Sequence, residues 1–227
     1  LDMIDIDAMK KYRKRLGWSG GVNRRSVSEM VVSLAISMLR HIFEANREVV
    51  SGVWRQRTGR YLSGCTVGII GCGFIGKDLV KLLKPFNCKI LVYDIKNYSD
   101  FYEEHDIVPT SLDDLLKLSD VVTLHLPLDG STRNILNKDK LRKMKSDSVL
   151  INMARGGLVD EKFLKEILKT GQILSASLDV FDIEPPNDKE LLQLTNFIAT
   201  PHIGGSANEA ILAMGKAAID GLDSCAM

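Results

Sequence analysis

Short apolar runs alternate with amphipathic segments from residue 66 towards the end of the chain. The runs are continuous and do not alternate with polar residues, which is typical of strands covered on both faces. They predict strands at 67–70, 89–93, 121–126, 149–153, 174–178 and 197–199. The segments between them, such as 75–83, 111–118 and 161–170, have helical periodicity. Strand and helix in alternation predict an α/β fold with a Rossmann-type, doubly wound parallel sheet.

The residues before this region follow a different pattern. The first 25 residues contain a basic cluster between Lys10 and Arg15 and predict a short helix followed by a loop. Ser26 and Glu29 have the spacing of a capping box, which predicts a helix from Ser28 to about Val50. Its middle is apolar on nearly all sides, so more than one neighbour has to cover it, and one of these could be a second subunit.

Composition and charge exclude several classes of protein. The 227 residues are 45% hydrophobic and 26% charged, which is close to the average of globular proteins. Lys and Arg total 30 against 29 Asp and Glu, so no basic field for nucleic acid is expected. The longest apolar-rich stretch, 30–39, is half of what a membrane span requires.

The cysteines and the N-terminus favour a cytoplasmic protein. Cys65, Cys72, Cys88 and Cys225 form no C-x-x-C pair and share no metal-ligand spacing with the histidines, so reduced thiols and no metal site are expected. The first residues do not resemble a secretory or transit signal. The chain begins with Leu1 rather than Met, as a fragment would.

A glycine motif follows the first strand of this region and opens a helix. Gly71, Gly73 and Gly76 form a G-x-G-x-x-G pattern, in which the glycines permit a tight turn, close approach of a pyrophosphate and close helix packing. Asp94 ends the second strand, where a carboxylate can accept both ribose hydroxyls of an adenosine. That carboxylate would repel a 2′-phosphate and favours NAD over NADP, although Lys96 tempers the preference. A purely structural turn is the alternative.

Three later strands each end in a residue suited to chemistry at one edge of the sheet. Arg155 could hold a carboxylate through two hydrogen bonds, and Asp179 follows the next strand. His202 is the candidate acid–base group, because histidine is the side chain whose unperturbed pKa lies near neutrality. Glu184 could accept from the other imidazole nitrogen, and Asp182 is the competing candidate. A salt bridge for Arg155 and a structural hydrogen bond for His202 remain alternatives.

Together these motifs resemble the D-isomer-specific 2-hydroxyacid dehydrogenase family. The resemblance covers nearly the whole chain, and its Arg, Glu and His follow the family's order with the family's flanking residues. The matching stretches are 71–76, 125–128 with Thr132, 152–160, 179–185 and 201–205.

The resemblance implies an NAD-dependent oxidoreductase that interconverts a D-2-hydroxy acid and a 2-keto acid. Arg155 would bind the substrate carboxylate and carbonyl oxygen, His202 would exchange the hydroxyl proton, and Glu184 would orient and charge-stabilise His202. Hydride would pass between nicotinamide C4 and substrate C2. The positions implied in cofactor binding are Gly71, Gly73, Phe74, Ile75, Gly76, Asp94, Leu126, Pro127, Thr132, Met153, Ala154, Arg155, Asp179, His202 and Gly204.

The resemblance also implies a division of the chain. Residues 1–22 resemble the end of a flavodoxin-like substrate domain and a hinge, residues 23–205 the NAD-binding domain, and 206–227 a C-terminal helix returning towards the substrate domain. Most of that domain is missing, so the 227 residues should bind cofactor but turn over poorly. Helix 28–50 resembles the family's dimerisation element, so a homodimer is expected. The alternative function is an NADH-sensing, corepressor-like binding module without turnover.

Overall fold

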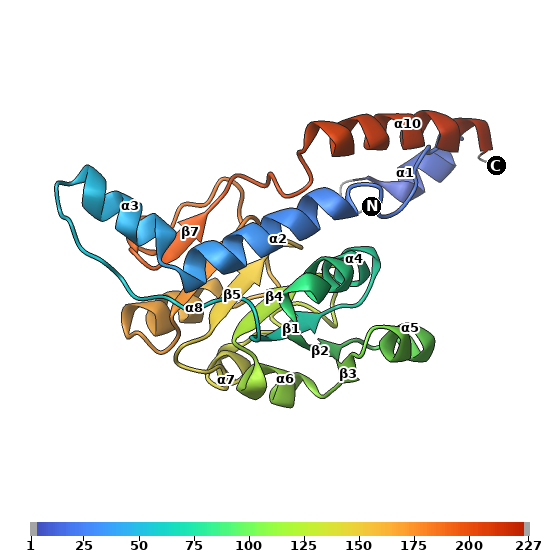
Figure 1. Cartoon of the computed structure of the whole chain (residues 1–227). Helices are drawn as coiled ribbons and strands as arrows, with labels where there is room; N and C mark the ends of the chain where they lie inside the picture. Colours follow the sequence, from blue (N-terminus) through green and yellow to red (C-terminus); the bar gives the residue numbers. More distant parts are fainter. Residues whose placement is uncertain (1–3, 225–227) are drawn as a thin grey trace.

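One parallel sheet forms the centre of the molecule (Figure 1). The structure is a computed structural model that describes residues 4–224, with side chains to residue 222. Among these residues seven strands pair in the order β3-β2-β1-β4-β5-β6-β7, every pair parallel. The order reverses between β1 and β4, which is where a doubly wound sheet opens a crevice for a dinucleotide. The strands are β1 Thr66–Ile70, β2 Lys89–Tyr93, β3 Val108–Pro109, β4 Val121–Leu124, β5 Val149–Asn152, β6 Ser175–Leu178 and β7 Phe197–Ala199.

The expected Rossmann-type α/β fold is confirmed, with each expected strand within two residues of its predicted ends. The two-residue strand β3 was not expected from the sequence. The helices are α1 Ile6–Lys11, α2 Arg24–Leu39, α3 Ile42–Val50, α4 Phe74–Leu83, α5 Ser99–Glu104, α6 Leu112–Leu118, α7 Lys138–Leu141, α8 Glu161–Lys169, α9 Lys189–Gln193 and α10 Asn208–Ser224, with a 3₁₀ turn at Lys84–Phe86.

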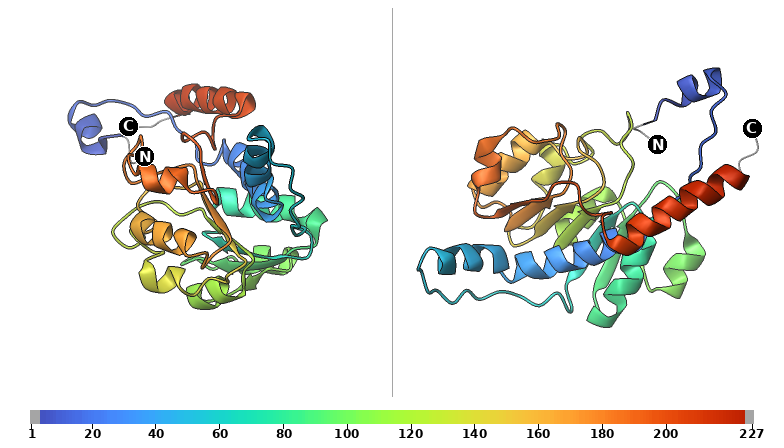
Figure 2. Two further views of the ribbon diagram at one scale, coloured as in Figure 1. Left: turned by 90° about the vertical axis from the view of Figure 1, so that its left-hand side faces the viewer. Right: turned by 90° about the horizontal axis from the view of Figure 1, so that it is seen from above.

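The sheet divides the apolar core into two layers. Successive strand residues point to opposite faces, so Val149 and Ile151 of β5 join one layer while Leu150 joins the other. Helices α2 and α4 cover the first layer, and α6, α7, α8 and α9 cover the second (Figures 1 and 2). Burial on both faces explains why the strands read as continuous apolar runs.

The helix expected from Ser28 to Val50 is wrong as a single element. It is two helices, α2 and α3, bent by 62° at a break where His41 has a left-handed φ of 56°. The physical reason lies in the returning chain, because the Arg60 N–H donates to the Leu39 carbonyl at 2.9 Å and ends the helical ladder there. Helix α3 and the segment after it therefore project from the body of the molecule (Figures 1 and 2).

The capping box expected at Ser26 is also wrong. Helix α2 begins two residues earlier, at Arg24, with Asn23 at the N-cap position. The Ser26 hydroxyl instead donates to the Gly204 carbonyl at 2.6 Å and accepts from the Ala207 N–H at 3.2 Å. The capping-box pattern considers only neighbouring residues, whereas this hydroxyl bonds a loop that lies 178 residues further along the chain.

Among residues 4–224, no single helix has both the length and the hydropathy needed to cross a membrane. Helices α2 and α3 reach that length and hydropathy only when they are taken together across their bend.

The segment before α2 and helix α10 lie against each other at one end of the molecule (Figures 1 and 2). A Cβ at Gly17 would lie 1.8 Å from the Ala218 carbonyl oxygen, and one at Gly221 would lie 2.6 Å from the Trp18 nitrogen. Only glycines allow the two backbones to come this close. Residues 1–3 of the expected domain remnant and residues 225–227 of the expected helix, Cys225 included, lie outside the described residues.

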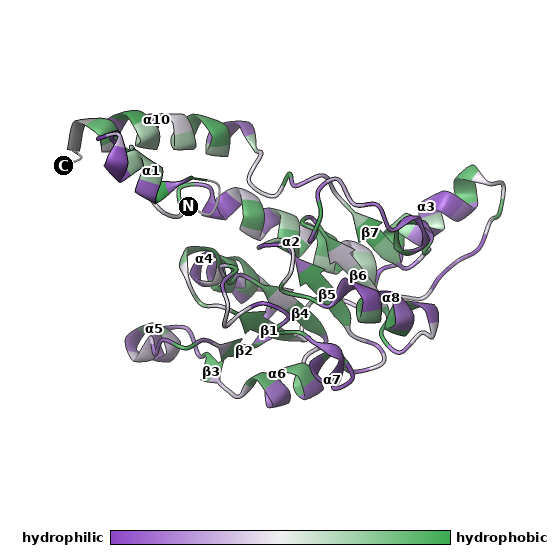
Figure 3. Ribbon diagram, turned by 180° about the vertical axis from the view of Figure 1, so that it is seen from behind, coloured by the Kyte–Doolittle hydropathy of each residue, from purple (hydrophilic) through white to green (hydrophobic). Residues whose placement is uncertain are grey.

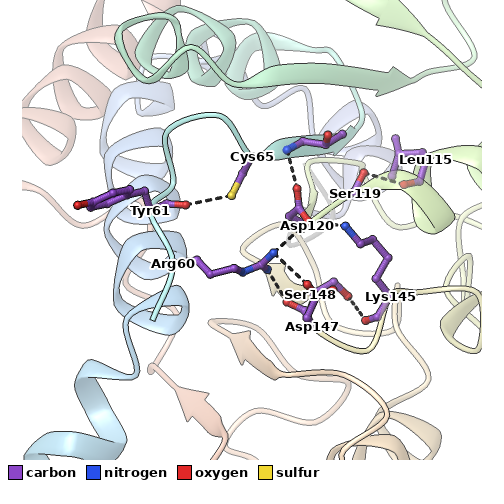
Figure 4. A network of polar contacts seen from close by, with 10 residues as sticks. Arg60, Tyr61, Cys65, Leu115, Ser119, Asp120, Lys145, Asp147 and Ser148 are labelled. Atoms are coloured by element: carbon purple, nitrogen blue, oxygen red, sulfur yellow. Dashed lines mark hydrogen bonds and ion pairs between the residues drawn. The ribbon is translucent and has the colours of Figure 1, made fainter. Parts of the chain in front are cut away.

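A network of charged side chains binds the segment before β1 to the amino ends of the strands (Figure 4). Asp120 is buried and accepts from the Thr66 N–H at 2.8 Å and from Lys145 Nζ at 2.5 Å. Arg60 donates to the same carboxylate at 3.3 Å and to the Asp147 carbonyl at 2.6 Å. Burial alone would raise the pKa of Asp120, but these hydrogen bonds and cations outweigh it and lower the pKa.

Candidate functional site

Each glycine of the turn after β1 meets a different steric demand. Gly71 has a φ of +100°, and a Cβ there would lie 2.7 Å from the His125 carbonyl oxygen. A Cβ at Gly76 would lie 2.3 Å from the Gly71 oxygen, so helix α4 packs directly on the turn. A Cβ at Gly73 would have no neighbour within 4 Å. Gly73 is the N-cap of α4, so the unpaired N–H groups of the helix start face this space.

Asp94 closes the turn from the end of β2. One carboxylate oxygen accepts from the Cys72 N–H at 2.6 Å, and the other accepts from the Lys96 N–H at 2.8 Å. The Cys72 thiol is fully buried, which raises its pKa to about 11, so it is a packing group. An open glycine turn, a helix start and a carboxylate at the neighbouring strand end fit a dinucleotide of the NAD type.

A cleft of about 420 Å³ lies beyond the carboxyl ends of the strands and brings together most of the predicted site. Arg155 follows β5, Asp179 follows β6 and His202 follows β7, and all three line this cleft. Its other predicted lining residues are Ile75, Leu126, Pro127, Met153, Ala154 and Gly204. Residues far apart in sequence therefore share one site.

His202 and Glu184 form a pair at the rim of the cleft. Imidazole Nδ1 lies 2.9 Å from Glu184 Oε2, while the Phe181 N–H donates to Glu184 Oε1 at 3.0 Å. Burial alone would raise the pKa of Glu184, but the contacts with His202 and Phe181 outweigh it and lower the pKa. The competing candidate, Asp182, instead faces Arg133, with 3.2 Å between Oδ1 and Nη1.

The Asp179 side chain holds the turn that carries His202 through hydrogen bonds. His202 has a φ of 55°, a left-handed conformation that is uncommon outside glycine and is concentrated at functional sites. The Asp179 side chain is almost completely buried and accepts from the N–H groups of Ile203 and Gly204, at 2.8 and 2.7 Å, and from the Thr200 hydroxyl at 2.5 Å. These bonds fix the turn against its backbone strain.

Arg155 is half-buried on a loop that Asn152 shapes. The Asn152 amide donates to the Arg155 carbonyl at 2.8 Å and accepts from the Ala154 N–H at 3.1 Å. Arg155 Nη1 donates to the Ala154 carbonyl at 2.6 Å. The guanidinium is thus directed by its own loop along the wall of the cleft that His202 also lines.

Other predicted residues lie outside the cleft lining. Glu184 contacts His202 from behind, and the Thr132 hydroxyl donates to the Pro127 carbonyl at 2.7 Å and so shapes the neighbouring loop. The remainder belong to the glycine turn and its surroundings: Gly71, Gly73, Phe74, Gly76 and Asp94.

The structure adds cleft residues that the sequence did not single out as site residues. His125 follows β4, and its Nε2 lies 3.0 Å from the Thr123 hydroxyl. Its Nδ1 is buried and has no hydrogen-bond partner among residues 4–224, and burial lowers the pKa of the imidazole to about 3. Its position near the end of a predicted strand was the feature of the sequence that could have identified it as a cleft residue. The other additions are Asn23, Val27, Gly205, Ser206 and Met214.

Comparisons with known proteins agree with this geometry. Residues 32–204 match the family model described as the NAD-binding domain of D-isomer specific 2-hydroxyacid dehydrogenases. Hydroxypyruvate reductase of Thermotoga maritima is 39% identical over 216 residues, which cover 92% of this chain and 69% of that protein. D-3-phosphoglycerate dehydrogenase of Methanocaldococcus jannaschii is 38% identical over 218 residues, which cover 95% of this chain but only 42% of that protein.

Solved structures show the same arrangement. The D-lactate dehydrogenase of Aquifex aeolicus, complexed with NAD and lactic acid, superimposes with a TM-score of 0.87 at 28% identity. The match covers 99% of this chain and 73% of that one. The expected NAD-binding domain is therefore confirmed.

Proposed function

The chain belongs to the D-isomer specific 2-hydroxyacid dehydrogenase family, and from this premise we propose that it forms the cofactor domain of an NAD-dependent enzyme. The enzyme would interconvert a D-2-hydroxy acid and the corresponding 2-keto acid. Residues 23–205 would form the cofactor-binding unit, and the connecting segments on either side would lead to a substrate domain. The observation that carries the proposal is that Arg155 and His202 line one cleft, while the Glu184 carboxylate contacts His202 from outside the lining.

We propose that His202 moves the substrate proton through Nε2. Nδ1 already lies 2.9 Å from Glu184, so Nε2 is the ring nitrogen left to meet a hydroxyl or carbonyl oxygen. The lowered pKa of Glu184 keeps that group a carboxylate, which stabilises the imidazolium formed when His202 takes up the proton.

Arg155 would hold the substrate carboxylate and direct its C2 towards the cofactor site. A planar guanidinium can donate two parallel hydrogen bonds to a carboxylate, which fixes orientation as well as position. NAD, when bound, supplies the hydride acceptor at nicotinamide C4. Asp179 would keep the His202 turn in place beside that site.

The proposal is tested by substituting His202 in the intact protein. His202→Asn is the appropriate variant, because Asn tolerates a left-handed backbone and the fold is preserved. Activity is followed through NADH absorbance with glyoxylate, hydroxypyruvate and pyruvate, and NADH affinity through fluorescence. We expect turnover to fall by about 10²- to 10⁴-fold with NADH affinity retained.

Two outcomes would contradict the proposal. Wild-type turnover in the His202→Asn variant would remove the assigned role of His202. NADH binding without oxidation by any of the acids would instead favour the binding-module alternative.

We also propose that two copies pack through α3 and the segment that follows it. Val50 is 80% exposed and Trp54 is 84% exposed, so a second copy packed here would remove both side chains from water. Helix α3 carries both hydrophobic and hydrophilic residues, whereas the segment after it is mostly hydrophilic (Figure 3). Sedimentation of the wild-type chain and of Trp54→Ser tests the proposal: a dimer weakened by the substitution supports it, and a wild-type monomer contradicts it.

A further inference from the structure

The loop that carries Glu184 is held by groups outside the cleft. We call residues 181–184 the acid loop. Its first side chain, Phe181, is buried and meets the Phe197 ring edge-on, with 6.4 Å between centroids. Its last side chain, Glu184, contacts His202, and the Phe181 N–H bonds the same carboxylate. The position of Glu184 therefore depends on the backbone between residues 181 and 184.

Glu161 fastens that backbone from the first turn of α8. Its Oε1 accepts from the Asp182 N–H at 2.7 Å. The carboxylate is half-buried, and burial raises its pKa more than the hydrogen bond from the Asp182 N–H lowers it. Arg133 also reaches the acid loop through the Asp182 side chain, but both partners are more than half exposed, and such pairs contribute little.

The same peptide touches the loop that carries Arg155. A Cβ at Gly156 would lie 1.8 Å from the Phe181 carbonyl oxygen and 2.6 Å from the Asp182 nitrogen. The backbone next to Arg155 is thus in van der Waals contact with the peptide that Glu161 bonds. One peptide group, between Phe181 and Asp182, adjoins both halves of the site.

We propose that Glu161 is a positioning residue, whose hydrogen bond to the Asp182 N–H sets the acid loop so that Glu184 meets His202 while Gly156 keeps Arg155 against the same peptide. The effect on catalysis rests on the proposed dehydrogenase function, whereas the effect on the acid loop does not. Glu161 itself is no catalytic residue, since it lies on the far side of the loop and does not line the cleft.

The decisive comparison is Glu161→Ala against Glu161→Gln. Both remove the charge of Glu161, which lies close enough to Glu184 for the two carboxylates to repel each other. Only Ala removes the oxygen that accepts from Asp182. The difference between the two variants therefore isolates the hydrogen bond. Lys162→Gln, an exposed change of charge on the same helical turn, is the matched control.

The first measurement is the titration of Glu184, followed by carbon NMR of its carboxyl group in the 227-residue chain. In Glu161→Ala we expect the pKa of Glu184 to rise towards its ordinary value, because its contacts with the Phe181 N–H and His202 slacken. Glu161→Gln and Lys162→Gln should keep the pKa low. A general loss of stability would lower the melting temperature of the Ala variant without this selective change.

The second measurement is turnover of the intact protein. Glu161→Ala should lower kcat about 10- to 100-fold, with the KM for NADH little changed, and Glu161→Gln should restore most of it. If Glu161→Ala does not fold, Glu161→Asp replaces it, since a carboxylate shortened by one methylene cannot reach the Asp182 N–H at the same distance.

The outcomes separate the two proposals. An unmoved Glu184 titration in the Ala or Asp variant, or equal effects of Ala and Gln, overturns the positioning role. A moved titration in a protein without turnover on any acid leaves the positioning role standing and removes the dehydrogenase proposal.

Discussion

The glycine turn after β1 allows cofactor binding and stability to be perturbed separately. Gly73→Ser places a side chain into space that has no neighbour within 4 Å, and serine is a favoured residue at an N-cap. The melting temperature should therefore stay unchanged. The added side chain would occupy the approach that we propose for the pyrophosphate and would compete for the N–H groups expected to bind it. Steric overlap of about 1–3 kcal/mol corresponds to a roughly 5- to 150-fold rise in the Kd for NADH.

Gly76→Ala is the matched variant, and it should lower the melting temperature that Gly73→Ser leaves unchanged. Its Cβ would lie 2.3 Å from the Gly71 carbonyl oxygen, a backbone atom that no side-chain rotation can move away. Overpacking of this kind costs about 1–3 kcal/mol, and the better helix propensity of Ala returns about 1 kcal/mol. A net loss of up to about 2 kcal/mol lowers the melting temperature by up to about 8 °C in a chain of this size.

Fluorescence titration with NADH and thermal unfolding by circular dichroism measure both variants under the same conditions. The reasoning is refuted if Gly73→Ser binds NADH as the wild type does, since the open space would then not be the pyrophosphate site. It is equally refuted if Gly73→Ser melts as low as Gly76→Ala.

Three further substitutions probe groups that the fold buries. Asp120→Asn should melt below the wild type at pH 7, and the difference in melting temperature should narrow as the pH falls towards 3. The reason is that the lowered pKa of Asp120 stabilises the fold at pH values above the pKa of this group in the unfolded chain, and protonation removes this contribution. Melting curves at several pH values test the prediction. His125 has its pKa lowered to about 3, so the unfolded chain takes up a proton below about pH 6.5 that the folded chain does not. Between pH 6.5 and 5, the free energy of unfolding measured with urea should therefore fall by up to about 2 kcal/mol more in the wild type than in His125→Gln. An equal dependence on pH in the two proteins would show that the imidazole is not held neutral. Asp179→Ala leaves the Ile203 and Gly204 N–H groups unpaired, at about 1–3 kcal/mol each, and a melting temperature equal to the wild type would contradict the assigned clamp.

The sheet and most of the cleft were predictable because their signals are local. Burial on both faces leaves continuous apolar runs, and a parallel sheet brings the residues after its strands to one edge. The sequence alone therefore predicts that Arg155 and His202 lie together. The two-residue strand β3 ends in Pro109 and has no such run, so it left no pattern to find.

The features that the sequence did not predict depend on distant backbone. The apolar pattern continues across the break between α2 and α3, which is set by the Arg60 N–H at the Leu39 carbonyl. Ser26 has the spacing of a helix cap but bonds Gly204. The bond from the Asp182 N–H to Glu161 depends on a main-chain donor, which any residue except proline would supply at that position.

The crossing of Gly17 with Gly221 restricts how the ends of the molecule can move. Because a Cβ at either glycine would overlap backbone atoms of the facing segment, residues 17–18 and 218–221 fit together without room for a side chain. A larger residue at Gly17 or Gly221 would push the segment before α2 away from α10 and change the direction in which each leaves the sheet.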